Sequence, residues 1–321
     1  MSDIGILTAE IMAGRRLSKK DDLTILKEAP LRELCDGADK LRACFSGDRV
    51  DLCTIISARN GACSENCRFC AQSAHNHTGC EVYGLLDYDK IRAAALANEK
   101  AGVDRFAIVI SGHSPSGEDF EKIITICKRL RSELKIGLCA SLGFLSKEQF
   151  ERLYDAGVSS YHNNIETSPG FFERICTSHT FEDKVANIKR ARSAGLNVCS
   201  GGIIGMGETM DDRLDMALAL SELGVRSIPV NTLIPIPGTP LEDLPRLDNE
   251  EILRTIAAFR YINPEADIRM GAGRKLIRGN GEAAFESGAS ATITGDMLTT
   301  SGSTIKNDRN MLIKMGRIVT S

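Results

Sequence analysis

The sequence predicts an α/β protein that folds as a (β/α)8 barrel of the TIM type. Eight short β-branched or apolar runs occur along the chain, and amphipathic helical stretches separate them. Alternating strands and helices indicate a parallel sheet, and eight such units close into a barrel. The length of 321 residues also admits two domains, but no Pro-rich or Ser/Gly-rich linker divides the chain. We expect a helical extension over 1–49, the barrel over 50–300 and a C-terminal tail over 301–321.

The N-terminal extension is expected to form two or three short helices. In the segment LRELCDGADKLRACF, apolar residues such as Leu34 and Leu41 recur at helical spacing. We therefore interpret Cys35 and Cys44 as core residues, because a free cysteine packs as a small hydrophobic side chain. The same interpretation applies to Cys127 in the helical segment EKIITICKRL.

The barrel elements are expected in strict alternation. The strands are VDLCTIIS (50–57), RFAIVIS (105–111), KIGLCAS (135–141), SSYHNNI (159–165), NVCSGGII (197–204), RSIPVNTL (226–233), ADIRMGA (266–272) and SATITGD (290–296). The helices between them are expected at 87–101, 117–133, 146–156, 181–194, 210–223, 249–261 and 280–288. Several of these end at a glycine, such as Gly157 and Gly195, which is a common stop signal for a helix.

Composition excludes several classes of partner. Lys and Arg number 40 against 43 Asp and Glu, so neither a nucleic-acid footprint nor a polybasic membrane patch is indicated. No apolar run is long enough to span a membrane, and the N-terminus lacks the apolar core of a signal peptide. We therefore expect a cytoplasmic protein. In that reducing compartment, its eleven cysteines indicate metal binding, redox chemistry or burial rather than disulfides.

Three cysteines are concentrated in the segment NGACSENCRFCAQS, directly after the first expected strand. Cys63, Cys67 and Cys70 have CxxxCxxC spacing on a loop, so their thiolates converge on a shared ligand. A zinc site would need a fourth ligand, for which His75 and His77 are the local candidates, although we interpret both as solvated loop residues. A 4Fe-4S cluster held by three cysteines instead leaves one iron open for a small molecule.

This loop resembles the radical S-adenosylmethionine superfamily in its cysteine spacing, in Phe69 before the last cysteine and in its place after the first barrel strand. A second match to the superfamily is GGIIGMGE, which fits the pattern GxIxGxxE through Gly201, Ile203, Gly205 and Glu208. The resemblance places this segment beside the adenosine of S-adenosylmethionine. It implies that the open iron binds the amino and carboxylate groups of S-adenosylmethionine. An electron from the cluster then splits the molecule into methionine and a 5′-deoxyadenosyl radical, which takes hydrogen from an unactivated carbon.

A second set of candidate ligands lies within the expected strands. Cys53, Cys139 and Cys199 fall on the first, third and fifth strands, and Arg269 falls on the seventh. Alternate strands contribute to one layer of a barrel interior, so these residues can meet around the axis. A buried arginine is costly without an anionic partner. A second iron–sulfur cluster would supply the negative charge. Alternatively, the cysteines are ordinary core residues and Arg269 pairs with a carboxylate.

From about residue 50 onward the chain resembles the biotin synthase family. The matching segments are YHNNIETSP, VCSGGIIGMGET, NTLIPIPGTPL and IRMGAGR. The resemblance implies conversion of dethiobiotin to biotin by two hydrogen abstractions and insertion of one sulfur, which is drawn from an auxiliary cluster in the barrel. It also implies a homodimer and an electron donor such as flavodoxin or ferredoxin.

The resemblance also implies a ligand set for the auxiliary cluster. In the familiar members this is a 2Fe-2S cluster held by three cysteines and an arginine, and Cys139, Cys199 and Arg269 match three of those positions. The fourth position falls on Ala107, which cannot ligate iron. We infer that Cys53 on the adjoining strand takes its place, and that the cluster is 2Fe-2S or a larger variant.

Two other cysteines depart from the family pattern. We interpret Cys80 and Cys176 as packing residues, although either could reach a larger cluster.

The resemblance extends to the substrate pocket. It places Glu166 and Lys184 at S-adenosylmethionine, where the family carries Asp and Arg, and His162 where the family carries Asn. It places Asn164 and Asn231 at the substrate, and an amide suits a cyclic urea because it offers both donor and acceptor. The alternative for each asparagine is a strand-end residue that satisfies backbone groups.

Two other functions remain open. The first is a radical enzyme of the same subgroup, such as a hydrogenase maturase or a mutase, which would need no sulfur insertion. The second is an iron–sulfur carrier without catalytic activity, in which Glu208 and the GxIxGxxE segment would have no purpose.

Overall fold

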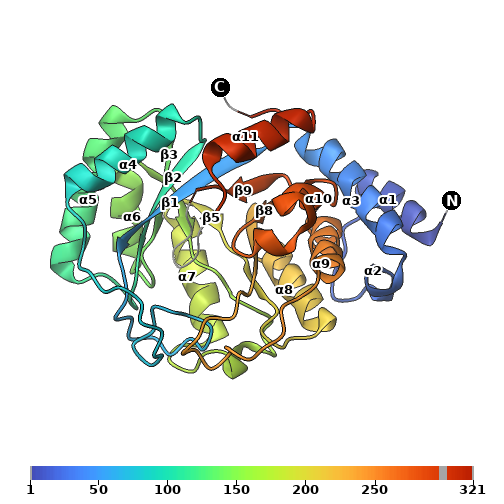
Figure 1. Ribbon diagram of the computed structural model, residues 1–321, viewed down its shortest axis with the longest axis horizontal. Coiled ribbons are helices and arrows are strands. Elements are labelled where there is room, and N and C mark those ends of the chain that lie inside the picture. The colour runs from blue at the N-terminus through green and yellow to red at the C-terminus, as the bar shows by residue number, and fades with distance from the viewer. Residues whose placement is uncertain (1, 296–301, 320–321) are drawn as a thin grey trace.

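A computed structural model of the chain describes residues 2–295 and 302–319 (Figure 1). Asp296, the expected end of the last strand, and the expected boundary at 300–301 lie outside the described residues. The described part is one closed parallel barrel surrounded by helices, as predicted (Figure 1).

The strands of the barrel are all parallel. They are β1 (Asp51–Arg59), β2 (Arg105–Ile110), β3 (Gly137–Ser141), β4 (Val158–His162), β5 (Asn197–Cys199), β6 (Gly202–Ile204), β7 (Ser227–Thr232), β8 (Asp267–Met270) and β9 (Ala291–Ile293). Their order in the sheet is β5-β4-β3-β2-β1-β9-β8-β7-β6, and a pairing between β5 and β7 closes the ring.

The expected single strand over 197–204 is interrupted, which corrects the prediction. The backbone amide of Ser200 donates to the carbonyl of Ser227 (3.0 Å), and the amide of Gly201 donates to the Asn164 side chain (3.0 Å). A Cβ at Gly201 would lie 1.9 Å from the carbonyl oxygen of Pro229. The chain therefore crosses closely over β7 at this point, and only glycine fits there.

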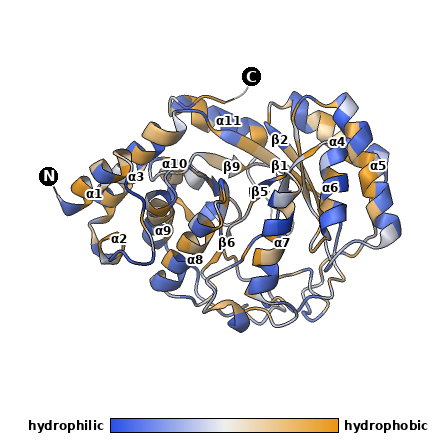
Figure 2. Ribbon diagram, turned by 180° about the vertical axis from the view of Figure 1, so that it is seen from behind, coloured by the Kyte–Doolittle hydropathy of each residue, from blue (hydrophilic) through white to orange (hydrophobic). Residues whose placement is uncertain are grey.

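Helices cover the outside of the barrel (Figure 1). They are α4 (Tyr88–Lys100), α5 (Gly117–Glu133), α6 (Lys147–Asp155), α7 (Phe181–Ser193), α8 (Met210–Glu222), α9 (Asn249–Ile262) and the short α10 (Glu282–Phe285). Hydrophobic and hydrophilic stretches alternate along α5 and α6 (Figure 2), as expected for helices with one buried side. Cys127 on α5 is fully buried, as predicted.

The N-terminal extension forms α1 (Asp3–Met12), α2 (Thr24–Glu28) and α3 (Leu31–Ser46), and α3 packs on α9. A Cβ at Gly37 would lie 1.9 Å from the Tyr261 hydroxyl, so this glycine permits the close packing. Cys35 is buried, but Cys44 is exposed, so the prediction that Cys44 belongs to the core is wrong. Cys44 lies in the last turn of α3, at the margin of the buried stripe that includes Leu34 and Leu41.

The C-terminal segment includes a helix, α11 (Ile305–Lys314), which runs above β1 and β9 in Figure 1. The buried Asp308 of α11 accepts two hydrogen bonds from Arg274 (2.8 and 2.9 Å). Beyond the helix, Ile318 pairs with Arg49 at the start of the barrel. The segment is thereby attached to the barrel wall. No helix among the described residues has the length and hydropathy needed to cross a membrane.

Candidate active site

One cavity of about 550 Å³ opens among the loops that follow the strands, and it contains both sets of cysteines. Its lining includes Cys63, Cys67 and Cys70 of the loop, Cys53, Cys139, Cys199 and Arg269 of the barrel interior, and Asn164, Glu166, Lys184, Ile203 and Asn231. The structure therefore brings together most of the residues singled out in the sequence. Gly201, Gly205 and Glu208 do not line this cavity.

The loop between β1 and α4 is held in shape by its own backbone and side chains. The amide of Cys63 donates to the carbonyl of Gln72 (2.9 Å), and the amide of Cys70 donates to the carbonyl of Cys67 (3.1 Å). The Asn76 side chain donates to the carbonyls of Cys67 and Cys70 (3.2 and 2.8 Å). Three thiols on a braced loop at one cavity suit a 4Fe-4S cluster, which is held by cysteine thiolates.

Glu65, inside the CxxxCxxC loop, joins this loop to the segment that follows β4. One carboxylate oxygen is paired with His113 Nδ1 (2.8 Å), and the other accepts from the Ser178 hydroxyl (2.6 Å) and pairs with His179 Nδ1. Burial opposes ionisation of Glu65, but these partners together hold its pKa below the ordinary value. No local sequence signal marks this network, because its members are 48 and 114 positions apart in the chain.

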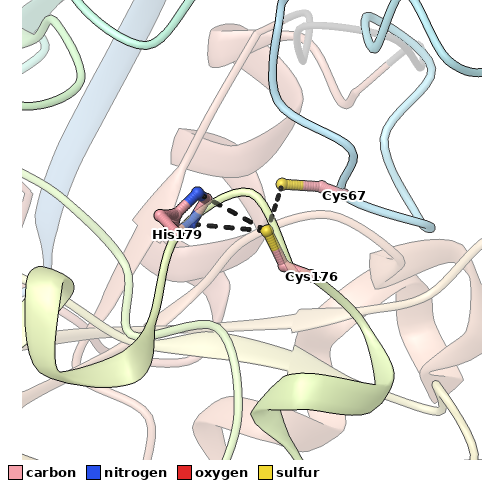
Figure 3. Close-up of side chains that lie close together, drawn as sticks. All are labelled: Cys67, Cys176 and His179. Atoms are coloured by element: carbon pink, nitrogen blue, oxygen red, sulfur yellow. Dashed lines mark hydrogen bonds between the residues drawn. The ribbon is translucent and has the colours of Figure 1, made fainter.

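Cys176, which is predicted from the sequence to be a packing residue, lies close to this network. It is buried among Phe171, Phe172 and Met206, yet its Sγ is also 3.7 Å from Cys67 Sγ (Figure 3). Cys80 lies apart from the lining of the cavity, and its Sγ accepts from the Asn60 side chain (3.3 Å). Of Cys80 and Cys176, the two cysteines that depart from the family pattern, only Cys176 lies close to a cysteine of the CxxxCxxC loop.

The barrel interior places Cys53 beside Cys139. Together with Ala107 they form a small buried cluster of their own. Ala107 pairs in register with Ile55 on one side and Cys139 on the other, so it occupies the position between the two cysteine-bearing strands. A side chain as small as alanine leaves space at this position, and the Cys53 thiol lies near it.

Arg269 is 3% exposed and pairs with the carboxylate of Asp51, as the alternative interpretation of the interior residues expects. Its Nη2 donates to Asp51 Oδ1 (2.5 Å), its Nη1 to the carbonyls of Asp51 and Thr292 (3.3 and 3.2 Å), and its Nε to the Ser227 hydroxyl (3.3 Å). Asp51 also pairs with Arg105 (2.9 Å). These contacts leave one N–H of Nη2 available at the cavity.

Cys199 completes the interior group. Its Sγ accepts from the Ser227 hydroxyl (3.3 Å), and it pairs in register with His162 on β4. Burial raises the pKa of Cys199, but the His162 hydrogen bond and the Arg269 charge lower it overall.

The adjacent thiols of Cys53 and Cys139 differ in their pKa values. A hydrogen bond between them lowers the pKa of Cys139 and raises that of Cys53. Because the thiolate is the form that ligates metal, the lowered pKa values of Cys139 and Cys199 beside a guanidinium suit ligands of an iron–sulfur cluster.

Glu166 and Lys184 lie side by side at the cavity, with Glu166 Oε1 3.9 Å from Lys184 Nζ. The backbone of Glu166 has a φ of +69°, which is uncommon outside glycine and indicates local strain. Asn164 donates to Glu166 Oε2 (3.3 Å) and accepts from the amide of Gly201 (3.0 Å). This set can present a carboxylate and an ammonium group to a zwitterionic ligand.

Both the nitrogen and the oxygen of the Asn231 side-chain amide form hydrogen bonds with the backbone. It donates to the carbonyl of Gly202 (3.1 Å) and accepts from the amide of Ala272 (3.0 Å). A Cβ at Gly271 would lie 2.1 Å from Asn231 Oδ1, so glycine is needed beside it. Each group of the amide keeps one further hydrogen-bonding position for a ligand.

The carboxylate of Glu208 binds groups of the protein itself and does not line the cavity. It accepts from the amides of Gly205 and Met206 (2.7 Å each) and pairs with the buried Arg213 (2.7 Å). These bonds fix the turn after β6, whose Ile203 side chain lines the cavity.

A parallel barrel with a CxxxCxxC loop at the C-terminal end of β1 defines the class of radical S-adenosylmethionine enzymes. Residues 59–220 match the family model of the radical SAM superfamily, and residues 229–318 match that of the biotin and thiamin synthesis associated domain. The fold is similar to that of methylornithine synthase, with a TM-score of 0.84 and 21% identity over 98% of this chain and 97% of that one. It is also similar to that of an FeFe-hydrogenase maturase, with a TM-score of 0.81 and 18% identity over 98% of this chain and 74% of that one.

Sequence comparison defines the family more narrowly. The chain is 55% identical to the biotin synthase of Clostridium beijerinckii over 97% of this chain and 98% of that protein. It is 53% identical to that of Alkaliphilus metalliredigens over 98% and 99%, respectively. The chain belongs to the biotin synthase family. It is therefore an enzyme of the radical SAM superfamily, whose cofactors are a 4Fe-4S cluster and S-adenosylmethionine.

Proposed function

We propose that this enzyme converts dethiobiotin to biotin, and that Cys53, Cys139, Cys199 and Arg269 hold an auxiliary iron–sulfur cluster that donates the sulfur. The observation that carries the proposal is the shared cavity, which is lined by both the loop cysteines and the interior group. A substrate in this cavity can touch a cofactor at the loop and a sulfur source in the barrel at once. A mutase or maturase of the same subgroup would have no use for the interior thiols.

Each cofactor would have its own ligands. Cys63, Cys67 and Cys70 would hold the 4Fe-4S cluster, and Glu166 and Lys184 would bind S-adenosylmethionine. When bound, these groups supply radical chemistry and sulfur, while the chain binds and orients the reactants. Because Ala107 stands between the cysteine-bearing strands, the auxiliary cluster would be a 2Fe-2S cluster or a larger variant with Cys53 as ligand.

The amides at the cavity would recognise the substrate. Asn164 and Asn231 each keep a free donor and a free acceptor, which matches the N–H and C=O groups of a cyclic urea. Their positions are fixed by the backbone bonds already described, so recognition would need little reordering. The apolar parts of the lining, such as Ile55 and Val109, would exclude water from a reactive intermediate.

The test is anaerobic reconstitution with iron and sulfide, followed by iron and sulfide quantitation, Mössbauer spectra and a biotin assay with dethiobiotin and S-adenosylmethionine. We expect two distinct clusters and biotin. A single four-iron cluster without biotin would overturn the proposal and return the interior cysteines to the core.

The variant Cys53→Ala tests the unusual ligand. We expect it to lose the iron and sulfide of the auxiliary cluster while the loop cluster remains. The matched control is Cys127→Ala, which also removes one buried thiol but lies on α5. Full retention of both clusters in Cys53→Ala would contradict the assignment.

Further parts of the proposal concern the cellular setting. We propose a flavodoxin or ferredoxin as electron donor, a homodimer, and a cytoplasmic location. The location is supported by the cysteines, since none of the eleven is paired in a disulfide, as is typical of a reducing compartment. We also propose that residues 1–49 and 301–321 act as extensions of one catalytic barrel over 50–300.

A further inference from the structure

The cavity of the active site extends along the whole length of the barrel strands. On β2, the alternate residues Arg105, Ala107 and Val109 line it, and Arg105 is the first residue of the strand. On β7, the lining runs from Ser227, the first residue, to Asn231 near the other end. The cavity therefore continues past the interior cysteines to the N-terminal ends of the strands.

Small side chains keep this part of the barrel open. A barrel of this type is usually filled by layers of bulky branched side chains, which make it a packed core and not a pore. The cavity lining here includes Ala107, Cys139, Ser160, Cys199 and Ser227 instead. Alanine, serine and cysteine are too small to fill the interior, so a passage remains along the axis.

The passage reaches solvent at the N-terminal ends of the strands. Asn197 is the first residue of β5 and Arg226 directly precedes β7, and both residues are exposed and line the cavity. Asp267, the first residue of β8, also lines it and is partly exposed. We call Arg105, Asn197, Arg226 and Asp267 the N-terminal mouth. Cys199, two residues beyond Asn197 on β5, is only partly buried.

The charges inside the N-terminal mouth favour an anion. Arg105 and Arg269 share a single carboxylate, that of Asp51, so these three groups carry one net positive charge. Arg105 also donates to the Ser160 hydroxyl (3.2 Å) inside the passage. Guanidinium groups only donate hydrogen bonds, so they suit an anionic ligand.

The outer charges point the same way. The side chain of Arg226 is 68% exposed and pairs with Glu265, which Arg16 also contacts. Asp267 is linked to the buried guanidinium of Arg260 through a shared serine hydroxyl (3.1 and 3.0 Å). Each acid at this end of the barrel is therefore matched by at least one arginine, and the net charge is positive.

We propose that hydrosulfide enters the barrel through the N-terminal mouth and reaches the interior cysteines by this passage. Under the proposed function, each biotin formed takes one sulfur from the auxiliary cluster, so every further turnover needs sulfide from outside the chain. The passage admits it without crossing the part of the cavity that binds dethiobiotin and S-adenosylmethionine. The identity of the anion rests on the proposed function, whereas the existence of the passage does not.

The test of the passage is alkylation of the chain without its clusters by iodoacetate, with the modified cysteines identified by peptide mass spectrometry. Cys199 reports access through the N-terminal mouth, and Cys63 reports access at the other end of the cavity. Asn197→Trp should slow modification of Cys199 about tenfold or more, because a filled interior is reached only through local opening. Modification of Cys63 should be unchanged. The matched control is Asn310→Trp, at an exposed asparagine on α11.

The preference for an anion is tested by comparing iodoacetate with the neutral iodoacetamide. Both reagents attack the same thiolate, so the ratio of their rates at Cys199 reports the charge along the route and not the pKa of the thiol. Arg226→Gln should lower that ratio about threefold or more, since it removes a positive charge from the mouth. Lys122→Gln, which removes an exposed charge on α5, is the matched control and should leave the ratio unchanged.

Sulfide itself is tested in a chain that carries Cys63→Ser, Cys67→Ser and Cys70→Ser, so that only the interior cluster can form. Iron is added first and radioactive sulfide second. Adding Asn197→Trp should slow uptake of the sulfide about tenfold, as for alkylation. If no sulfide is taken up even with Asn197 unchanged, the proposed function fails, and the alkylation rates still decide whether the passage exists.

Two results would overturn the inference. The first is an unchanged rate of Cys199 alkylation in both Asn197→Trp and Ser160→Leu, when circular dichroism shows that both variants are folded. Ser160 lies in register with Asn197 on the neighbouring strand β4, so the second variant fills the passage from another side. The second result is a ratio of iodoacetate to iodoacetamide rates that Arg226→Gln does not change, which would exclude an anion route through this mouth.

Discussion

The pair formed by Asp51 and Arg269 allows a quantitative test of how the barrel interior is stabilised. The variant Asp51→Asn keeps the size of the side chain and one acceptor oxygen but removes its charge. Arg269 is 3% exposed, so its charge would remain buried without its anionic partner. Arg105, the second partner of Asp51, has 35% of its side chain exposed and can turn to water.

Removing one partner of a buried ion pair costs about 3–5 kcal/mol. The lower end applies here, because the Asn oxygen and the carbonyls of Asp51 and Thr292 still accept from Arg269. We therefore expect Asp51→Asn to lower the free energy of unfolding by about 3 kcal/mol. Loss of the partly exposed contact with Arg105 should add well under about 1 kcal/mol.

The assay is urea unfolding of the chain without its clusters, followed by circular dichroism under anaerobic reducing conditions. The control is Glu118→Gln, which breaks an exposed pair with Lys122 (2.7 Å) and should change stability little. The double variant Asp51→Leu/Arg269→Met removes both charges and should be more stable than Asp51→Asn. A loss below about 1 kcal/mol in Asp51→Asn, or a double variant no more stable than it, would refute the reasoning.

The remaining predictions concern a helix cap, a close approach and a titrating carboxylate. Ser146→Ala removes the capping box of α6 and should cost about 1 kcal/mol in urea unfolding, without changing cluster content. Gly271→Ala forces its Cβ against Asn231 Oδ1 and should cost about 1–3 kcal/mol. It should also raise the KM for dethiobiotin in the biotin assay, and an unchanged KM would argue against Asn231 as a substrate ligand. For Asp212, burial opposes ionisation but hydrogen bonds from Thr209 hold its pKa below the ordinary value. Its contribution to stability is complete above about pH 4 and is lost as pH falls through the lowered pKa, so wild type and Asp212→Asn should converge in stability in acid.

The barrel and the cysteine loop could be predicted from sequence because both depend on local signals. The alternation of strands and helices is a periodic pattern over short windows, and it predicted the class of fold. CxxxCxxC is contained in eight residues, so its three thiols are close in space whatever the rest of the chain does. The grouping of Cys53, Cys139, Cys199 and Arg269 could also be predicted from the sequence, because alternate strands of a barrel contribute side chains to the same interior layer.

Tertiary structure decided which side chains meet across long separations. Asp51 and Arg269 are 218 positions apart and Cys67 and Cys176 are 109 apart, so no periodicity in the sequence connects them. Sheet register sets the first contact, and the path of the loop after β4 sets the second. The direction in which a side chain points could not be predicted from the sequence either. Glu208 is turned toward Arg213 rather than the cavity because two backbone amides bind its carboxylate.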